Sequence, residues 1–322
     1  MSDSSPHKAV TTYAILAVLS ASIAGLYAGA LTNPFPEFRT LKPDNSSSLS
    51  PSNLPNMPTP SDGKEQALAA IAMPQTRPEL AGLNLNYSLP NQNIQAGITT
   101  IPAIYIPAMP AEIGSLSVGE RKQIFTQIML PLILRANQLI AQDRHLLSKA
   151  DGTAVESLAK AYRVKTEDLA PEQIKAELEQ RIRPIPVSLA LAQAAIESGW
   201  GTSRFTQEAN ALFGQWAWRA EEGLKPKEAS NSRAVIKRFD TLQDSVISYM
   251  KNLNSHWAYQ DLRDARAAIY AAGDVPSGLQ LAPYMSSYAE TGEEYIETIS
   301  QVITRNQFTR FEDVQLAVQL EK

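Results

Sequence analysis

The spacing of apolar residues predicts helices over most of the second half of the chain. From Ser115 or Ser117, either of which suits an N-cap, a long amphipathic segment places Ile124, Ile128 and Leu132 at helical intervals. Shorter helical patterns follow at residues 152–164, 170–182, 184–198, 242–256, 258–273 and 292–308. Residues 210–241 break this pattern with aromatic residues, glycines and short β-prone runs, which predict a small hairpin lobe. The expected fold class is therefore α+β and mostly helical, with a β-lobe after the helix that contains Glu197.

The N-terminal part of the chain has a different pattern. Thr12–Thr32 contains no charged residue and is long enough to cross a bilayer, which predicts a cytoplasmic tail at residues 1–12 and a transmembrane signal-anchor at 13–32. The alternative is a cleaved signal peptide, because Ala28–Ala30 resembles a small-residue cleavage site. Either interpretation exports the remainder of the chain.

The next two segments lack helical periodicity or are broken by proline. Residues 33–63 are rich in proline, serine and asparagine and predict a disordered tether. Residues 64–116 form an accessory segment, in which an apolar run broken by Pro102, Pro107 and Pro110 predicts an extended packing strand or loop. The sequence leaves open whether this segment covers a groove or packs on the back of the domain.

Composition excludes several classes of function. A net charge of −4 without a dense basic block argues against nucleic acid as a partner. The chain has no cysteine, and its three histidines are scattered rather than placed at metal-ligand spacing. Neither a metal nor another cofactor is expected.

One acidic residue stands out at the end of an apolar helix. The stretch LALAQAAIESGWGTSRF delivers Glu197 to the last helical turn, where the helix macrodipole and apolar neighbours both disfavour the ionised carboxylate. A raised pKa suits a general acid that works near neutral pH. Gly199 and Gly201 allow a sharp turn beneath the acid. The alternative is an exposed glutamate beside a glycine C-cap.

Three tryptophans follow Glu197 closely in the sequence. Trp200, Trp216 and Trp218 fall within twenty residues, which suits sugar rings that stack on indole faces, although such residues also pack protein cores.

These segments resemble a known family. AQAAIESGWGTSRF followed by NALFGQW is similar to the peptidoglycan glucosaminidase domain, and specifically to its Bax-type branch. The likeness continues in IMLPLILRANQLIAQDR, ESLAKAYRV, RFDTLQDSVISYMKNLNSHWAYQDLR and YAETGEEYIETISQVITRNQF. It covers roughly residues 117–310, leaves 311–322 as a C-terminal tail, and implies a lysozyme-like α+β domain.

The resemblance also implies roles for individual residues. Glu197 is expected to be the general acid, and Tyr295 to lie close to the reacting sugar. Tyr288 is a weaker candidate for the same region, and both tyrosines could instead be core residues with a tethered hydroxyl. The remaining expected substrate-binding residues are the segment that shapes the groove floor and two tryptophans: Asn210, Phe213, Gly214, Trp200 and Trp216.

The second catalytic group is left open by the sequence. The β-lobe offers Glu221, Glu222 and Glu228, each of which could equally be a solvated charge. Alternatively, the N-acetyl group of the substrate acts as an internal nucleophile, oriented by Tyr295.

The expected function is a peptidoglycan hydrolase that cleaves the β-1,4 bond on the reducing side of N-acetylglucosamine. Its expected location is the inner membrane, with the catalytic domain in the periplasm; an envelope activator is an open question. Two rivals remain, namely a lytic transglycosylase that forms anhydromuramic ends and a non-catalytic glycan-binding protein of the envelope.

Overall fold

A computed structural model describes residues 78–83, 85, 87–90, 99–226, 235–289 and 291–317. The predicted cytoplasmic tail, transmembrane segment and tether lie outside these residues, as does Glu228.

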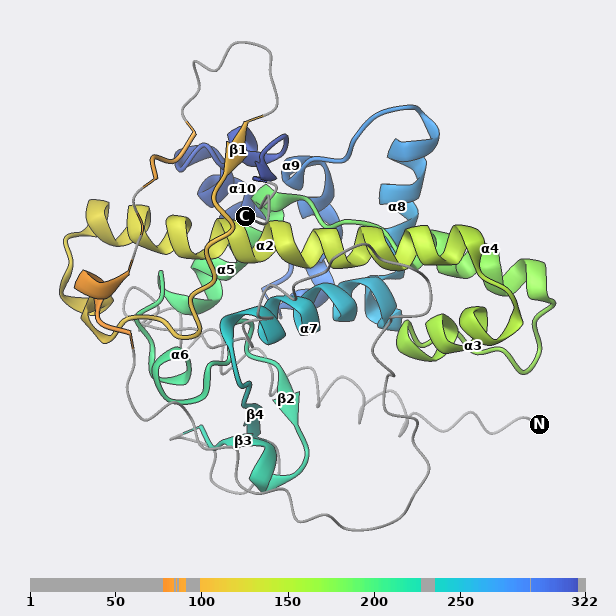
Figure 1. The fold of residues 1–322 in the computed structure, drawn as a ribbon, viewed down its shortest axis with the longest axis horizontal. Coiled ribbons are helices and arrows are strands. Elements are labelled where there is room, and N and C mark those ends of the chain that lie inside the picture. The colour runs from red at the N-terminus through yellow and green to blue at the C-terminus, as the bar shows by residue number, and fades with distance from the viewer. Residues whose placement is uncertain are drawn as a thin grey trace, which may run out of the picture.

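The helix α2 (Val118–Lys149) runs across the whole helical body (Figure 1). Ser117 is its N-cap: the serine hydroxyl accepts from the Glu120 N–H, and the Glu120 carboxylate accepts from the Ser117 N–H. Among the described residues, α2 is the one helix long and apolar enough to cross a membrane. Most of its apolar stretch is buried inside the protein, as is typical of a core helix.

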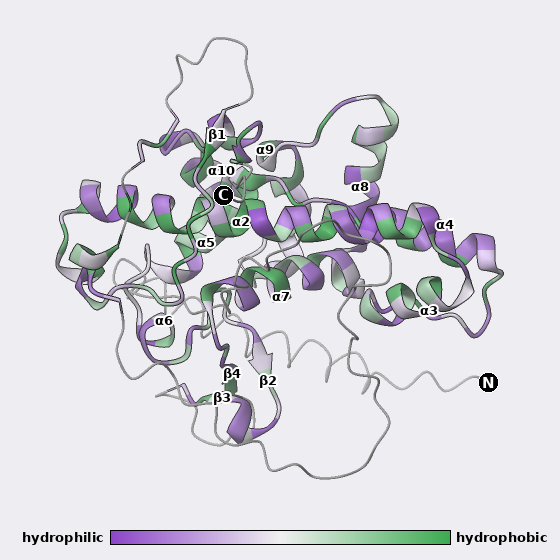
Figure 2. Cartoon of the chain, in the orientation of Figure 1, coloured by the Kyte–Doolittle hydropathy of each residue, from purple (hydrophilic) through white to green (hydrophobic). Residues whose placement is uncertain are grey.

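The helix that contains Glu197 is the most buried element. In α5 (Val187–Ser198) every residue except Ile196 and Glu197 is buried, and the helix packs against α2 and α10 (Glu293–Arg305). Figure 2 shows the contrast with α4 (Pro171–Arg181), a peripheral helix that is mostly hydrophilic and buries only Leu178. The alanine-rich composition of α5 thus reflects close packing on all sides.

The other helices surround α2 and α5. The predicted helical segments are confirmed, and two short helices, α6 and α9, are added. The remaining elements are α3 (Gly152–Ala161), α6 (Arg204–Ala209), α7 (Leu242–Ser255), α8 (Gln260–Ala271), α9 (Gly278–Leu281) and the 3-10 helices η2 (Leu80–Gly82), η3 (Ala111–Ser115), η4 (Ala220–Glu222), η5 (Trp257–Tyr259), η6 (Ala282–Tyr288) and η7 (Phe308–Phe311).

The predicted β-lobe is present as a three-stranded antiparallel sheet of order β2–β4–β3. Its strands are β2 (Trp216–Ala217), β3 (Gly223–Leu224) and β4 (Val235–Lys237), and Trp216 pairs with Ile236. The lobe projects from the helical body beyond α7 (Figure 1). The fold class is therefore a mostly helical α+β arrangement with a small sheet.

Residues 99–117 form a strap that packs on the domain. Strand β1 (Thr100–Ile101) pairs in parallel with β5 (Gln315–Leu316), and Ile106, Met109 and Ile113 are buried in the common core. The expectation of an extended packing segment is confirmed here. The expected C-terminal tail begins at residue 311. Its described part, residues 311–317, belongs to the same packing, because Phe311, Val314 and Leu316 are buried too.

Candidate active site

The helix α5 ends in a left-handed turn directly after Glu197. Gly199, Trp200 and Gly201 have φ values of 55°, 63° and 82°. The Ser198 hydroxyl donates to the Ala195 carbonyl and accepts from the Gly201 N–H at 3.1 Å. Glycine adopts this region freely, whereas Trp200 is strained by it. The turn fixes the acid at the edge of the buried helix.

The environment of Glu197 raises its pKa to about 7. The residue keeps part of its surface exposed, but protein atoms surround the carboxyl group, and desolvation disfavours its charged form. A hydrogen bond from Tyr295 acts in the opposite direction and is the smaller effect. The raised pKa of Glu197 agrees with the prediction from the sequence, and burial is its main cause.

A chain of hydrogen bonds orients the acid. Tyr295 donates to Oε1 of Glu197 at 2.7 Å, Gln193 donates from Nε2 to the Tyr295 hydroxyl at 3.0 Å, and Tyr249 donates to Oε1 of Gln193 at 2.5 Å. Since the Gln193 amide presents its NH₂ group to Tyr295, the single proton of the tyrosine is directed at the glutamate. Oε1 of Glu197 is thereby held as the acceptor, and Oε2 is left to carry an acidic proton.

Four tyrosines lie near the carboxyl group. The pKa values of Tyr249, Tyr259, Tyr288 and Tyr295 are all raised, chiefly by burial. The charge of Glu197 is a further cause for each of them, so all four lie within its electrostatic reach. The rings of Tyr288 and Tyr295 stack in parallel with centroids 5.4 Å apart. The site is a carboxyl group lined by phenols.

The predicted groove-floor segment is connected to these tyrosines. Phe213 stacks on Tyr249 at 3.7 Å, and its carbonyl accepts from the Tyr288 hydroxyl at 3.1 Å. Asn210 ends α6 in the left-handed region, with its side-chain NH₂ bonded to the Phe239 carbonyl at 3.1 Å. Gly214 follows with φ 58°. The structure therefore connects Phe213 to tyrosines of the site, whereas Asn210 joins the end of α6 to Phe239.

The tryptophans separate into two groups. Trp200 packs edge-on against Phe125 at 5.5 Å and near Phe308 at 6.0 Å, and Trp216 is half-buried in β2. In contrast, Trp218 and Trp257 are 68% and 69% exposed. The exposed indoles are thus Trp218, a member of the predicted cluster, and Trp257, which no sequence pattern indicated.

The β-lobe carboxylates Glu221 and Glu222 are exposed in η4, and Glu222 lies 3.8 Å from the Arg219 guanidinium. No second carboxylate in the described ranges contributes to the pKa shift of Glu197. No cluster of His, Asp or Glu suited to a metal ion occurs among the described residues either.

Three further residues of the site, Gln193, Tyr249 and Tyr259, were not predicted from the sequence. Gln193 could have been predicted, because it lies four residues before Glu197 and hence on the same face of α5. The tyrosines reach the site from α7 and η5, and no local pattern marks them.

Comparisons with known proteins cover this region. Residues 173–308 match the glucosaminidase family model, described as mannosyl-glycoprotein endo-beta-N-acetylglucosaminidase. The chain is 28% identical over 199 residues to Protein bax of Escherichia coli (strain K12), an alignment that spans 58% of this chain and 70% of that protein. No solved structure matches the chain significantly.

Proposed function

Because the chain is a Bax-type glucosaminidase-domain protein, we propose that it cleaves the β-1,4 bond on the reducing side of N-acetylglucosamine in peptidoglycan, with Glu197 as general acid. The observation that carries this proposal is the Glu197 carboxyl group itself. Its pKa is raised to about 7 and one oxygen is fixed by Tyr295, so a large fraction of the groups is protonated near neutral pH and the group is oriented. A lysozyme-like arrangement, in which the acid lies beside the β-lobe, is part of the same proposal.

In the proposed reaction, Glu197 transfers its proton from Oε2 to the glycosidic oxygen while the bond from that oxygen to the anomeric carbon breaks. The leaving sugar departs as an alcohol. The positive charge that develops at the anomeric carbon lies near a carboxylate that has just become negative.

For the second group we favour the N-acetyl oxygen of the substrate over a β-lobe glutamate. This choice is supported by the exposure of Glu221 and Glu222 and by the absence of a second carboxylate effect on Glu197 among the described residues. The acetamido oxygen attacks the anomeric carbon to give a cyclic intermediate. Water then opens the ring and returns a proton to Glu197. In this structure the hydroxyl of Tyr295 bonds to Glu197 and Gln193, so we assign it the task of positioning the acid.

We further propose that the apolar segment Thr12–Thr32 holds the chain in the inner membrane, with the catalytic domain in the periplasm. The uncharged composition of this segment and the polar tether after it support the arrangement. An envelope activator is not required by any described feature.

The test compares the full-length protein with its Glu197→Gln variant on purified peptidoglycan. We expect reduced glucosamine ends after borohydride treatment, seen by mass spectrometry and absent with the variant. Proton NMR of the first product should show a retained anomeric configuration. An inverted anomer would favour a β-lobe glutamate that activates water. Anhydromuramic ends would make the protein a lytic transglycosylase, and equal inactivity of both proteins would favour the glycan-binding role.

A further inference from the structure

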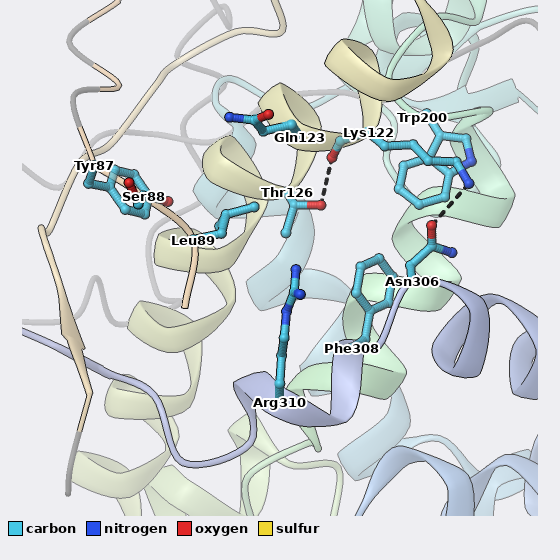
Figure 3. A pocket seen from close by; sticks show the side chains of 10 residues that line it. All are labelled: Tyr87, Ser88, Leu89, Lys122, Gln123, Thr126, Trp200, Asn306, Phe308 and Arg310. Atoms are coloured by element: carbon cyan, nitrogen blue, oxygen red, sulfur yellow. Dashed lines mark hydrogen bonds between the residues drawn. The ribbon is translucent and has the colours of Figure 1, made fainter. Parts of the chain in front are cut away.

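A pocket of about 410 Å³ lies beside Trp200, three residues after Glu197. Aromatic rings of Trp200 and Phe308 form one side, and residues 87–89 form the opposite side (Figure 3). Two of its ten lining residues are cationic, Lys122 and Arg310, and none is acidic. We call this cavity the Trp200 pocket. None of the proposed catalytic residues lines it.

The hydrogen-bond acceptor of the first cation, Lys122, is neutral within the part of the chain that the structure describes. Its Nζ donates to Oδ1 of Asn306 at 3.0 Å and lies 4.6 Å from the centre of the Trp200 ring. Burial and the nearby charge of Arg305 both lower the pKa of Lys122. The ammonium group thus lies in a positive field that an anion would relieve.

The second cation, Arg310, projects its guanidinium into the space between Leu89 and Phe308 (Figure 3). Its Nη1 makes one long contact of 3.4 Å with the side-chain oxygen of Gln307, and the guanidinium lies 4.7 Å from the centre of the Phe311 ring. Its buried Nε has no hydrogen-bond partner among the described residues. Within the described ranges no carboxylate pairs with it. A guanidinium presents paired donors that match a carboxylate, so Arg310 is suited to bind one.

The rest of the lining narrows the class of ligand. Amide side chains of Gln123 and Asn306 can bond peptide groups, and Leu89 and Phe308 offer apolar surface. We propose that the Trp200 pocket binds a carboxylate-bearing peptide, of the small, acidic kind that bacterial cell-wall glycan carries. The identity of this ligand rests on the proposed function, because peptidoglycan is the polymer that would present such a peptide next to the site.

This placement has a consequence for the substrate. Trp200 belongs to the same left-handed turn that fixes Glu197, so a peptide held against its indole lies next to the acid-bearing turn. Glycan that retains its peptides should therefore be bound more tightly than the same glycan after the peptides are removed.

The experiment measures binding separately from cleavage. The full-length Glu197→Gln protein is titrated calorimetrically with the free tetrapeptide released from purified peptidoglycan, with the same peptide amidated at its carboxylates, and with inorganic phosphate. Arg310→Gln and Lys122→Gln are tested in the same background. The matched control is Arg305→Gln, which removes a nearby positive charge outside the pocket lining.

We expect one site for the free peptide and affinity reduced at least about tenfold by Arg310→Gln or Lys122→Gln. Arg305→Gln should reduce it much less, because Arg305 adds to the positive field at Lys122 but does not line the pocket. Peptide-free glycan should be cleaved equally by wild type and by an Arg310→Gln variant that retains Glu197. Equal binding of the amidated peptide, or binding of phosphate alone, would overturn the carboxylate-peptide assignment. Absence of peptide binding by the Glu197→Gln protein, when wild type still releases glucosamine ends, would overturn this inference and leave the proposed function standing. Peptide binding together with no cleavage by wild type would overturn the proposed function and leave the peptide site standing.

Discussion

Tyr295 donates a hydrogen bond of 2.7 Å to the Glu197 carboxyl group, although 98 residues separate the two in the chain. The bond joins α10 to the last turn of α5, the two elements that pack most closely around the acid. Because Gln193 donates to the same hydroxyl, the tyrosine has one proton and one direction in which to give it. The pair is therefore a fixed unit in which the tyrosine determines the orientation of the acid.

Replacement of Tyr295 by phenylalanine should move the alkaline limb of the pH–activity profile to higher pH. The Tyr295 hydrogen bond lowers the pKa of Glu197, so its loss raises that pKa above about 7 and keeps the acid protonated further into the alkaline range. We expect kcat to fall about tenfold because the carboxyl group is no longer oriented. The measurement is the pH dependence of kcat on peptidoglycan fragments.

The control for that experiment is Tyr162→Phe. Tyr162 is another buried tyrosine that donates to a carboxylate, at 2.6 Å to Asp143, but it lies outside the site. This variant should lose stability and leave the limb in place. A shift of the limb in both variants would show that general destabilisation, rather than the Glu197 contact, is responsible.

Replacement of Glu197 by glutamine should raise the free energy of unfolding above pH 7 and change it little below pH 4.5. The folded-state pKa of Glu197 is about 7, against 4.5 for the ordinary group, so the unfolded chain releases this proton first as the pH rises. Stability therefore falls with rising pH between these values, by about 3 kcal/mol at 1.36 kcal/mol per pKa unit. Urea denaturation of both proteins at pH 4 and pH 8 measures the difference. Identical pH dependence of the two proteins would contradict the raised pKa.

Glu312 stabilises the opposite end of the same helix. Its carboxylate accepts from the Val187 N–H at 2.8 Å, the Ser188 hydroxyl at 2.5 Å and the Gly278 N–H at 3.2 Å, so it caps the N-terminus of α5 and ties it to α9. Glu312→Ala should lower the free energy of unfolding by about 1–3 kcal/mol, because buried donors lose their acceptor. Denaturant titration measures this loss. The neighbouring Asp313, which is exposed, provides the control: Asp313→Ala should change stability by less than about 0.5 kcal/mol.

Gly201 combines a left-handed backbone with close contact to the strap. A Cβ atom there would lie 3.1 Å from both the Met109 sulfur and the Ile113 Cδ1 atom. Gly201→Ala should therefore cost about 1–3 kcal/mol in stability and also reduce kcat, since the strained turn bears Glu197. Thermal unfolding and steady-state kinetics measure the two effects.

Gly273 separates backbone strain from contact with the strap. It has φ +88° but open space where a Cβ atom would lie, so Gly273→Ala has the strain without the collision. We expect the Gly201 substitution to be the more damaging, and we expect a Met109→Ala change to recover part of the difference. If both glycine substitutions have equal effects, the strap does not support the turn.

The chain's local patterns determined its helices, its β-lobe and its acid. The 3.6-residue periodicity located α2, and the continuous alanine-rich apolar run located α5, which is buried on nearly all sides. Glu197 could be chosen as a candidate because an apolar helix that ends in one acid before Ser-Gly-Trp-Gly is unusual in itself. The upward shift of its pKa could also be predicted from the sequence. Apolar residues that are close to Glu197 in the sequence also lie close to it in a helix.

The tertiary structure decided what surrounds that acid. Tyr249, Tyr259, Tyr288 and Tyr295 reach it from separate elements, and contacts between residues so distant in sequence depend on how helices pack rather than on local pattern. The same reason explains Trp200, whose indole faces Lys122 and Phe308 rather than remaining exposed. Whether a side chain supports the acid, binds a ligand or fills the core is set by the neighbours that folding brings to it.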